Sequence, residues 1–274
     1  MTTRLNYFKN KPKVSKIDVA TYLKRLNLSG EAPSLSFLRK LHRAHLLIVP
    51  FENLDIHYRQ KIVLDYELIF KKIIVGRRGG YCYELNGLFY HLLYHLGFDV
   101  KVISAQVFKE EEDAFGKAFG HMALLIKLEE NSYLADVGFG ECIVFPKMMK
   151  SMEVQMDHVN YWRLEEDADH HLVLKSSADA IHFKTQYRFS TQPKELIQFM
   201  EMNEYYQTNV SSSFTQGKLI TRLTESGRIT LTDRKFSELK LGKKLETEIQ
   251  SEDEFLAVLQ QHFGISYRDL NRIE

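Results

Sequence analysis

The sequence predicts an α+β fold, and three observations predict it. Apolar side chains in the first hundred residues recur at the spacing of helices. Residues 98–190 instead hold short β-rich segments separated by polar or glycine-bearing turns, a pattern typical of an antiparallel sheet or barrel. The remaining residues mix strands with helices. This order implies an α+β chain of two or three domains, and 274 residues with 44% hydrophobic side chains can form the core that it needs.

Four helices are expected in the first hundred residues. Ser34 can cap the second helix, Pro50 stops it, and Gly97 ends the fourth. Asp65 begins the third helix. The expected ranges are 19–28, 35–47, 65–74 and 82–98.

Six strands are expected in the middle of the chain, at 100–108, 121–129, 131–139, 161–167, 170–177 and 185–190. A helix over 193–206 should follow, with Pro193 in its first turn. The tail should then return to strands at 218–224, 227–233, 236–241 and 245–250, before a final amphipathic helix over 252–263.

The charge and cysteine content exclude several classes of protein. Basic and acidic side chains number 37 and 36, so no large electric field is available to hold nucleic acid or an anionic membrane. Two cysteines are too few for a disulfide scaffold. The polar N-terminus does not resemble a signal peptide, and no apolar run has the length of a membrane span, so a cytoplasmic location is expected.

Cys82 is the first candidate for chemistry. It lies in the segment RRGGYCYELN, residues 77–86, where two glycines let the backbone turn sharply and a helix then begins. The positive end of a helix dipole favours a thiolate, and unpaired backbone N–H groups at that end can hold an oxyanion. These features alone leave a buried structural cysteine as an equal alternative.

A nucleophilic thiol needs a base, and the base needs an orienting group. His121 opens an apolar strand, and Asp136 lies in another, where an unpaired carboxylate is costly. A hairpin turning at residues 129–131 would bring both side chains to neighbouring strands, near the same end. Taken alone, Asp136 is more simply interpreted as a residue that begins a turn before Gly138.

Four sequence blocks together resemble the arylamine N-acetyltransferase family. They are RGGYCYELN at 78–86, VPFENL at 49–54 with His45 before it, HMALLI at 121–126 and DVGFG at 136–140. They occur in the family's order over roughly residues 35–142, and the match is weaker in the last third, chiefly at 207–214. A chance match to all four blocks is implausible.

The resemblance implies a fold and a reaction. The fold would be a helical bundle over 1–97, a β-barrel over 98–200 and an α/β lid over 201–274, built around a cysteine-protease-like core. The reaction would move an acetyl group from acetyl-coenzyme A to an arylamine, arylhydroxylamine or hydrazine, in xenobiotic metabolism. Partners would be coenzyme A and the small amine, with no nucleic acid, membrane or metal.

The resemblance also implies roles for individual residues. Cys82 matches the thioester-forming nucleophile, His121 its base and Asp136 the orienting carboxylate. Positions that match the acceptor pocket are Phe51, Phe139 and Gly120. Positions that match contacts to the donor are Lys117, Ala118, Tyr205 and Ser211.

Three other readings of the same residues stay open. A cysteine protease or transglutaminase shares the thiol, imidazole and carboxylate, although here the histidine follows the cysteine by only 121 − 82 = 39 positions and the papain motif is absent. An acyltransferase with another donor, or one that closes an amide in biosynthesis, would keep the triad. A non-catalytic binding protein could retain the fold.

Four further residues have simpler interpretations. Cys142 lacks a glycine-rich approach and is expected to be structural or incidental. Glu52 can be buried and can orient the local backbone through hydrogen bonds. Gly138 and Gly140 fit a phosphate-binding turn or close packing beside the site equally well.

Overall fold

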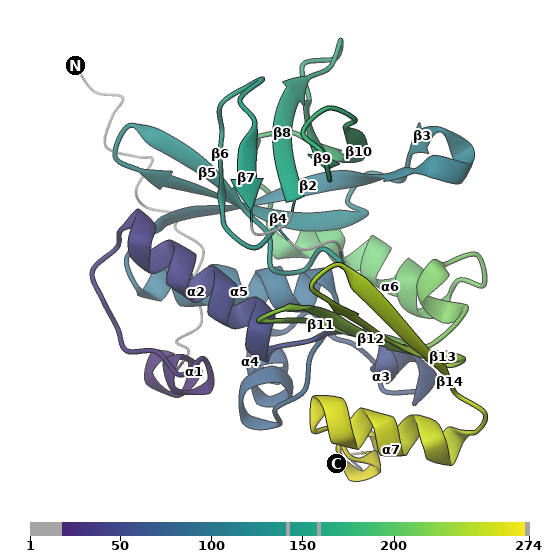
Figure 1. Cartoon of the computed structure of the whole chain (residues 1–274). Helices are drawn as coiled ribbons and strands as arrows, with labels where there is room; N and C mark the ends of the chain where they lie inside the picture. Colours follow the sequence, from purple (N-terminus) through teal and green to yellow (C-terminus); the bar gives the residue numbers. More distant parts are fainter. Residues whose placement is uncertain (1–17, 141–142, 158–159, 272–274) are drawn as a thin grey trace.

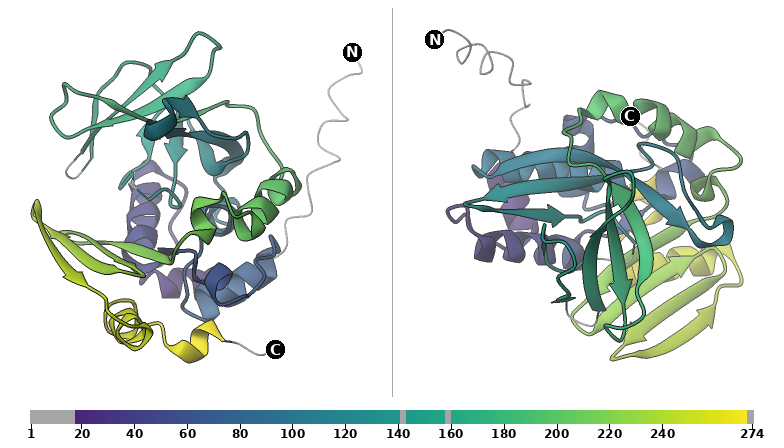
Figure 2. Two further views of the ribbon diagram at one scale, coloured as in Figure 1. Left: turned by 90° about the vertical axis from the view of Figure 1, so that its right-hand side faces the viewer. Right: turned by 90° about the horizontal axis from the view of Figure 1, so that it is seen from above.

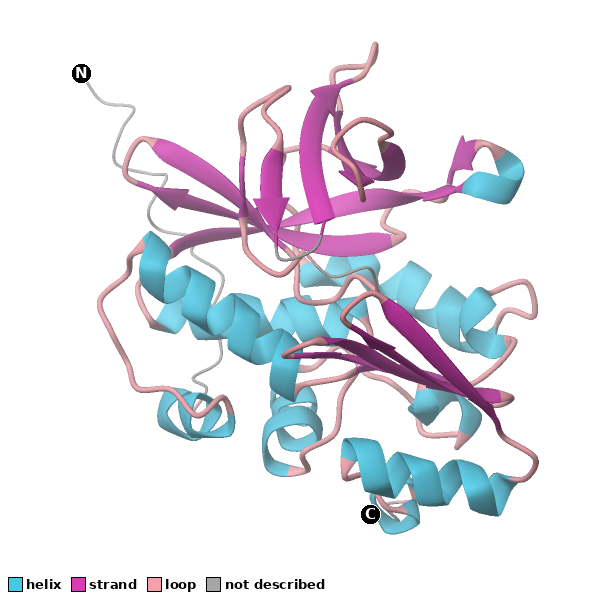
Figure 3. Cartoon of the chain, viewed as in Figure 1, coloured by secondary structure: helices cyan, strands magenta, loops and turns pink. Residues whose placement is uncertain are grey.

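The structure is a computed structural model, and it describes residues 18–140, 143–157 and 160–271. A large curved sheet, a layer of helices and a smaller sheet follow one another across the molecule (Figure 1 and Figure 3). Two further views show the large sheet over the helices, and the smaller sheet with the C-terminal helix on the other side (Figure 2). The α+β class is therefore confirmed.

The four expected N-terminal helices all form. Ser34 Oγ accepts a hydrogen bond from the Phe37 amide at the start of the second helix, and Gly97 follows the fourth in the left-handed region, with φ +91°. The third helix continues as a π-helical turn over Lys71–Val75. The helices are α1 Val19–Arg25, α2 Leu35–Ile48, α4 Tyr66–Phe70 and α5 Cys82–His95, with a short unexpected helix α3 at Leu54–His57.

The central strands form one antiparallel sheet in the order β6-β5-β4-β2-β10-β9-β8-β7, with β3 paired to β2. An isolated bridge between Ser151 and Leu164 joins the segment after β6 to β8, so the sheet nearly closes into the expected barrel. The strands are β2 Asp99–Lys109, β3 Ala114–Phe115, β4 His121–Leu128, β5 Asn131–Ala135, β6 Lys147–Met148, β7 Gln155–Asp157, β8 Asn160–Glu166, β9 Leu172–Ser177 and β10 Lys184–Phe189.

The C-terminal region adds a second sheet. Its order is β1-β11-β12-β13-β14, so a strand from the N-terminal part of the chain, β1 (Phe51–Glu52), forms one edge. The other strands are β11 Leu219–Thr224, β12 Gly227–Thr232, β13 Lys235–Lys240 and β14 Lys243–Glu248, and the helices are α6 Met200–Thr208, α7 Glu252–Phe263 and α8 Tyr267–Leu270. The prediction that Pro193 lies in a first helical turn is wrong, because a 3₁₀ turn over Leu196–Phe199 leads into α6 instead.

Two apolar cores hold these layers together near the site. The buried face of α5 packs against β2 and β4, with Leu88, Met122 and Leu124 fully buried. The smaller sheet buries Ile220 and Leu231 beneath Phe255 of α7. Within the described ranges, no helix combines the length and apolar character that crossing a bilayer requires.

Candidate active site

Cys82 is the first residue of α5, as expected, and it is 3% exposed. The helix begins there because the Glu84 carboxylate turns back and accepts a hydrogen bond from the Tyr81 amide at 3.2 Å. The thiol lines a cavity of about 790 Å³. It is free, buried and placed at the end of the helix where backbone N–H groups are unpaired within the helix.

The loop before Cys82 is fixed by a buried ion pair. Arg78 donates through Nε and Nη2 to the two oxygens of the Glu52 carboxylate, at 2.8 and 2.9 Å. The same carboxylate accepts from the amides of Leu54 and Gly79, at 3.0 and 3.2 Å. The interpretation of Glu52 as a buried residue that orients backbone is therefore confirmed.

The β4–β5 hairpin forms as expected, with Leu128 paired to Asn131 across the turn. It brings His121 and Asp136 together, so that His121 Nε2 lies 2.6 Å from Asp136 Oδ2. Cys82 and His121 line the same cavity, and the nearby thiol is one of the groups that raise the pKa of the imidazole. Because Asp136 occupies Nε2, Nδ1 is the ring nitrogen left to face the thiol.

The Asp136 carboxylate is completely buried, and both of its oxygens are saturated with hydrogen bonds. Oδ1 accepts from Asn86 Nδ2 at 2.8 Å and from the Gly138 amide at 3.0 Å. Oδ2 accepts from His121 and from the Tyr187 hydroxyl, the latter at 3.1 Å. A buried carboxylate with this set of partners stays ionised and holds the imidazole in one orientation.

The protonation of the pair follows from its surroundings. Burial alone would lower the pKa of His121, but the Asp136 charge, the hydrogen bond to Asp136 and the nearby Cys82 outweigh it and raise that pKa to about 10. Burial alone would raise the pKa of Asp136. The imidazolium of His121 and the hydrogen bonds from Asn86 and Gly138 outweigh burial, so this pKa is lowered. His121 and Asp136 therefore form a buried ion pair of imidazolium and carboxylate.

Most of the other residues predicted for the site line the cavity beside Cys82. Phe51, Phe139 and Gly120 line it, as do Lys117, Tyr205 and Ser211. The Lys117 ammonium lies 3.7 Å from the centre of the Tyr205 ring. Asp136 lies behind His121, and Ala118 is exposed and is not among the residues that line the cavity.

Three residues that support the triad have no role in the sequence-based prediction. Asn86 donates to both Met122 O and Asp136, and its own Oδ1 accepts from the Val137 amide at 2.9 Å. His42 Nε2 accepts from the Asp136 amide at 3.0 Å, and Tyr187 packs on the His121 ring. Asn86 could have been found from its position one turn after Cys82, whereas the other two come from distant segments.

Gly138 packs against the helix that carries the thiol. A Cβ added there would lie 2.7 Å from Cys82 Cα and 2.8 Å from Asn86 Nδ2. Gly138 therefore serves close packing, whereas a Cβ at Gly140 would meet nothing within 4 Å. Cys142 lies outside the described residues, so its structural interpretation stays a prediction.

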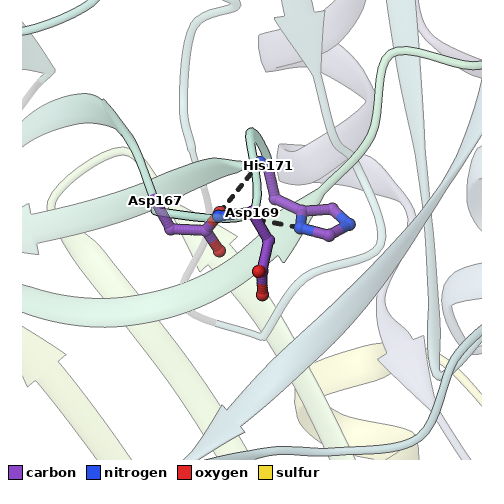
Figure 4. Close-up of side chains that lie close together, drawn as sticks. All are labelled: Asp167, Asp169 and His171. Carbon is purple, nitrogen blue, oxygen red and sulfur yellow. Dashed lines mark hydrogen bonds and ion pairs between the residues drawn. The ribbon is translucent and has the colours of Figure 1, made fainter.

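One cluster among the described residues has the composition of a metal site. Asp167, Asp169 and His171 lie close together in the turn between β8 and β9 (Figure 4). The Asp167 carboxylate accepts from the amides of Asp169 and His171, at 3.0 and 2.9 Å. These bonds are those of a polar hairpin turn, and the cluster lies outside the lining of the cavity beside Cys82.

Comparisons with known proteins agree with the fold and this geometry. An N-acetyltransferase family model matches residues 34–271. An arylamine N-acetyltransferase of Escherichia coli is 32% identical over 252 residues, which cover 90% of this chain and 89% of that protein. A solved arylamine N-acetyltransferase from Salmonella typhimurium superposes with a TM-score of 0.86 at 28% identity, covering 93% of each chain. One from Bacillus cereus, described as having a unique Cys-His-Glu catalytic triad, has a TM-score of 0.84 at 26% identity and covers 92% of this chain and 100% of that one.

A family match over most of the chain, together with a shared fold, defines the class as an acetyl-transferring enzyme. The chain belongs to the arylamine N-acetyltransferase family. The resemblance seen in the four sequence blocks is thereby confirmed.

Proposed function

We propose that the enzyme transfers an acetyl group from acetyl-coenzyme A to an arylamine, arylhydroxylamine or hydrazine through a thioester on Cys82. The observation that carries this proposal is that Cys82 and His121 line one cavity, while His121 is hydrogen-bonded to the buried Asp136 carboxylate. The Cys-His-Glu triad named for the Bacillus cereus relative supports it, with aspartate as the acidic member here.

The first half-reaction forms the acetyl-enzyme. The Cys82 thiolate attacks the thioester carbonyl, and unpaired amides at the start of α5 are available to the developing oxyanion. Collapse of the tetrahedral intermediate expels coenzyme A, and the His121 imidazolium gives the leaving sulfur its proton. Asp136 keeps the ring oriented while its charge changes.

The second half-reaction passes the acetyl group to the amine. An aromatic amine is mostly neutral at pH 7, so its nitrogen attacks the acetyl-enzyme directly. Neutral His121 then takes the proton that the new amide loses, and the Cys82 thiolate leaves. Phe51 and Phe139 are half-buried and line the cavity, where their rings suit a flat aromatic acceptor.

We assign the donor to the part of the cavity formed by Lys117, Tyr205 and Ser211, with Ala118 next to it in the chain. Lys117 is exposed and carries a positive charge, which suits the phosphates of coenzyme A. Ser211 is exposed and offers a hydroxyl. Gly120 follows Lys117 and Ala118 in the sequence, directly precedes His121 and lines the cavity. We therefore assign it to contact with the acceptor.

The test is acetyl transfer from acetyl-coenzyme A to a simple arylamine. Cys82→Ala should abolish transfer, and Cys142→Ala, the matched change at the other cysteine, should retain it. Retained activity in Cys82→Ala would overturn the proposal. A protease or transglutaminase would instead turn over a peptide substrate, and a panel of acyl-coenzyme A donors and amines would identify an acyltransferase with different substrates.

A further inference from the structure

The turn that leads into His121 is strained. Phe119 lies in the left-handed region, with φ +59°, although it is neither glycine nor asparagine. The turn closes through a hydrogen bond from the Gly120 amide to Lys117 O at 3.1 Å, and β4 begins at the next residue. Such a conformation persists only where the surrounding structure holds it, and strain of this kind gathers at functional sites.

Three hydroxyl groups hold this turn. Ser104 Oγ accepts from the Phe119 amide at 3.1 Å. The Tyr83 hydroxyl donates to Phe119 O at 2.5 Å, and the Tyr206 hydroxyl donates to Gly120 O at 2.7 Å. The three come from different elements, β2, α5 and α6, so the Phe119 amide, the Phe119 carbonyl and the Gly120 carbonyl are each tied to a separate part of the molecule.

The two tyrosines connect the site to its surroundings. Tyr83 follows Cys82 directly in α5, so its hydroxyl joins the helix of the thiol to the strand of the imidazole. Tyr206 joins α6 to the same turn, and a Cβ on Gly120 would lie 3.1 Å from its hydroxyl oxygen. The two rings also pack together, with centroids 5.9 Å apart.

We propose that Tyr83 and Tyr206 are positioning residues that set the distance and angle between the His121 imidazole and the Cys82 thiol. Tyr206 lines the cavity and Tyr83 does not, but neither needs to touch a substrate for this role. The inference rests on the proposed function for its catalytic meaning. The geometric effect on the thiol exists whichever acyl donor the enzyme uses.

The test uses Tyr83→Phe and Tyr206→Phe, which remove only the hydroxyl groups. Tyr22→Phe is the matched control, because Tyr22 is fully buried and its hydroxyl has no hydrogen-bond partner among the described residues. The readout is the rate of Cys82 alkylation by iodoacetamide, followed by mass spectrometry of the peptide. We expect each test variant to slow it on the order of tenfold, since small misplacements of reacting groups are costly, and the control to leave it unchanged.

A double-mutant cycle separates positioning from a general loss of structure. In a His121→Gln background, Tyr83→Phe should have no further effect on the alkylation rate, because the group through which it acts is gone. An equal slowing in both backgrounds, or no slowing in either, would overturn the inference. If Tyr83 acts only by positioning, kcat should fall while the KM for acetyl-coenzyme A stays the same.

The same proteins distinguish failure of this inference from failure of the proposed function. If wild-type protein is not acetylated by acetyl-coenzyme A but the alkylation cycle behaves as expected, the donor assignment fails and the positioning role stands. If acetylation occurs and the cycle is additive, the positioning role fails alone.

Discussion

Asp136 shows how single residues hold this site in place. Its carboxylate is buried with four hydrogen-bond donors, two on each oxygen, and its backbone amide donates to His42. Burial also lowers the pKa of His42 to about 4, so this second histidine is neutral and serves as an acceptor. One histidine beside Asp136 is therefore charged and the other neutral, because only the first is paired with the carboxylate.

The raised pKa of His121 predicts a pH dependence of stability. Its pKa goes from 6.5 for an unperturbed histidine to about 10 in the folded state, so the folded protein binds the proton more tightly. This contribution to the free energy of unfolding is fully present below about pH 6.5 and is lost as the pH rises toward 10. The lowered pKa of Asp136 acts at the acidic end of the pH range. It contributes stability above about pH 3.8, and this contribution is lost as the pH falls further.

We expect the Tm of the wild-type protein to fall relative to that of His121→Gln as the pH rises from 6.5 to 10. Thermal denaturation at a series of pH values measures this difference. A Tm difference that is constant over the interval would contradict the assignment of a protonated His121.

Among the elements, the loop after β5 and the start of α5 depend on each other most closely. Local residue patterns correctly indicated the helix start, the hairpin and the two residues that meet. They could not decide whether Gly138 binds a ligand or packs, because that depends on which segment lies against it. The structure brings Cys82 Cα there, at a distance that leaves no room for a side chain.

Gly138→Ala should destabilise the protein by about 1–3 kcal/mol, because the added methyl group meets backbone that cannot easily move. It should also slow acetylation of Cys82 by displacing the first turn of α5. Gly140→Ala in the same loop should change the free energy of unfolding by less than about 0.5 kcal/mol. Urea denaturation of both variants measures the two values, and equal effects would refute the packing role.

A buried charge network supports the other side of α5. The Lys72 ammonium lies 2.7 Å from a carboxylate oxygen of Glu84 and 2.7 Å from one of Asp55. Asp55 also pairs with Arg78. With Glu52, three carboxylates face two cations. Burial raises the pKa of Glu84 to about 7 against the pull of Lys72, which fits the excess of acidic groups.

Lys72→Met should therefore destabilise the protein by about 3–5 kcal/mol, because the buried Glu84 carboxylate loses its cation and Asp55 keeps only Arg78. Lys71→Met is the matched control: Lys71 is the preceding residue, it is exposed, and its loss should cost less than about 0.5 kcal/mol. Chemical denaturation measures both. A loss below about 1 kcal/mol for Lys72→Met would mean that the network contributes little.

The whole molecule is joined in ways that local sequence patterns do not reveal. Periodicity predicted nearly every long helix and strand, but a two-residue strand such as Phe51–Glu52 has no period to detect. That strand nevertheless pairs with β11 and bridges to Gly80 beside the thiol, so the N-terminal and C-terminal regions meet at the site. His42 and Tyr187 reach Asp136 from equally distant segments, and only the tertiary fold brings them there.

The cavity is likewise assembled from the whole chain. Phe51 comes from the N-terminal region, Phe139 from the barrel and Tyr205 from α6. In the proposed mechanism donor and acceptor meet at one thiol in this cavity, and acetylated Cys82 is the intermediate that the two half-reactions share.

The most direct measurement is the mass of the protein after mixing with acetyl-coenzyme A in the absence of any amine. We expect release of one coenzyme A per chain and one acetyl group on the Cys82 peptide, which an arylamine then removes. Wild-type protein that gains no acetyl group, gains it on Cys142, or releases coenzyme A only when the amine is present would contradict a Cys82 thioester.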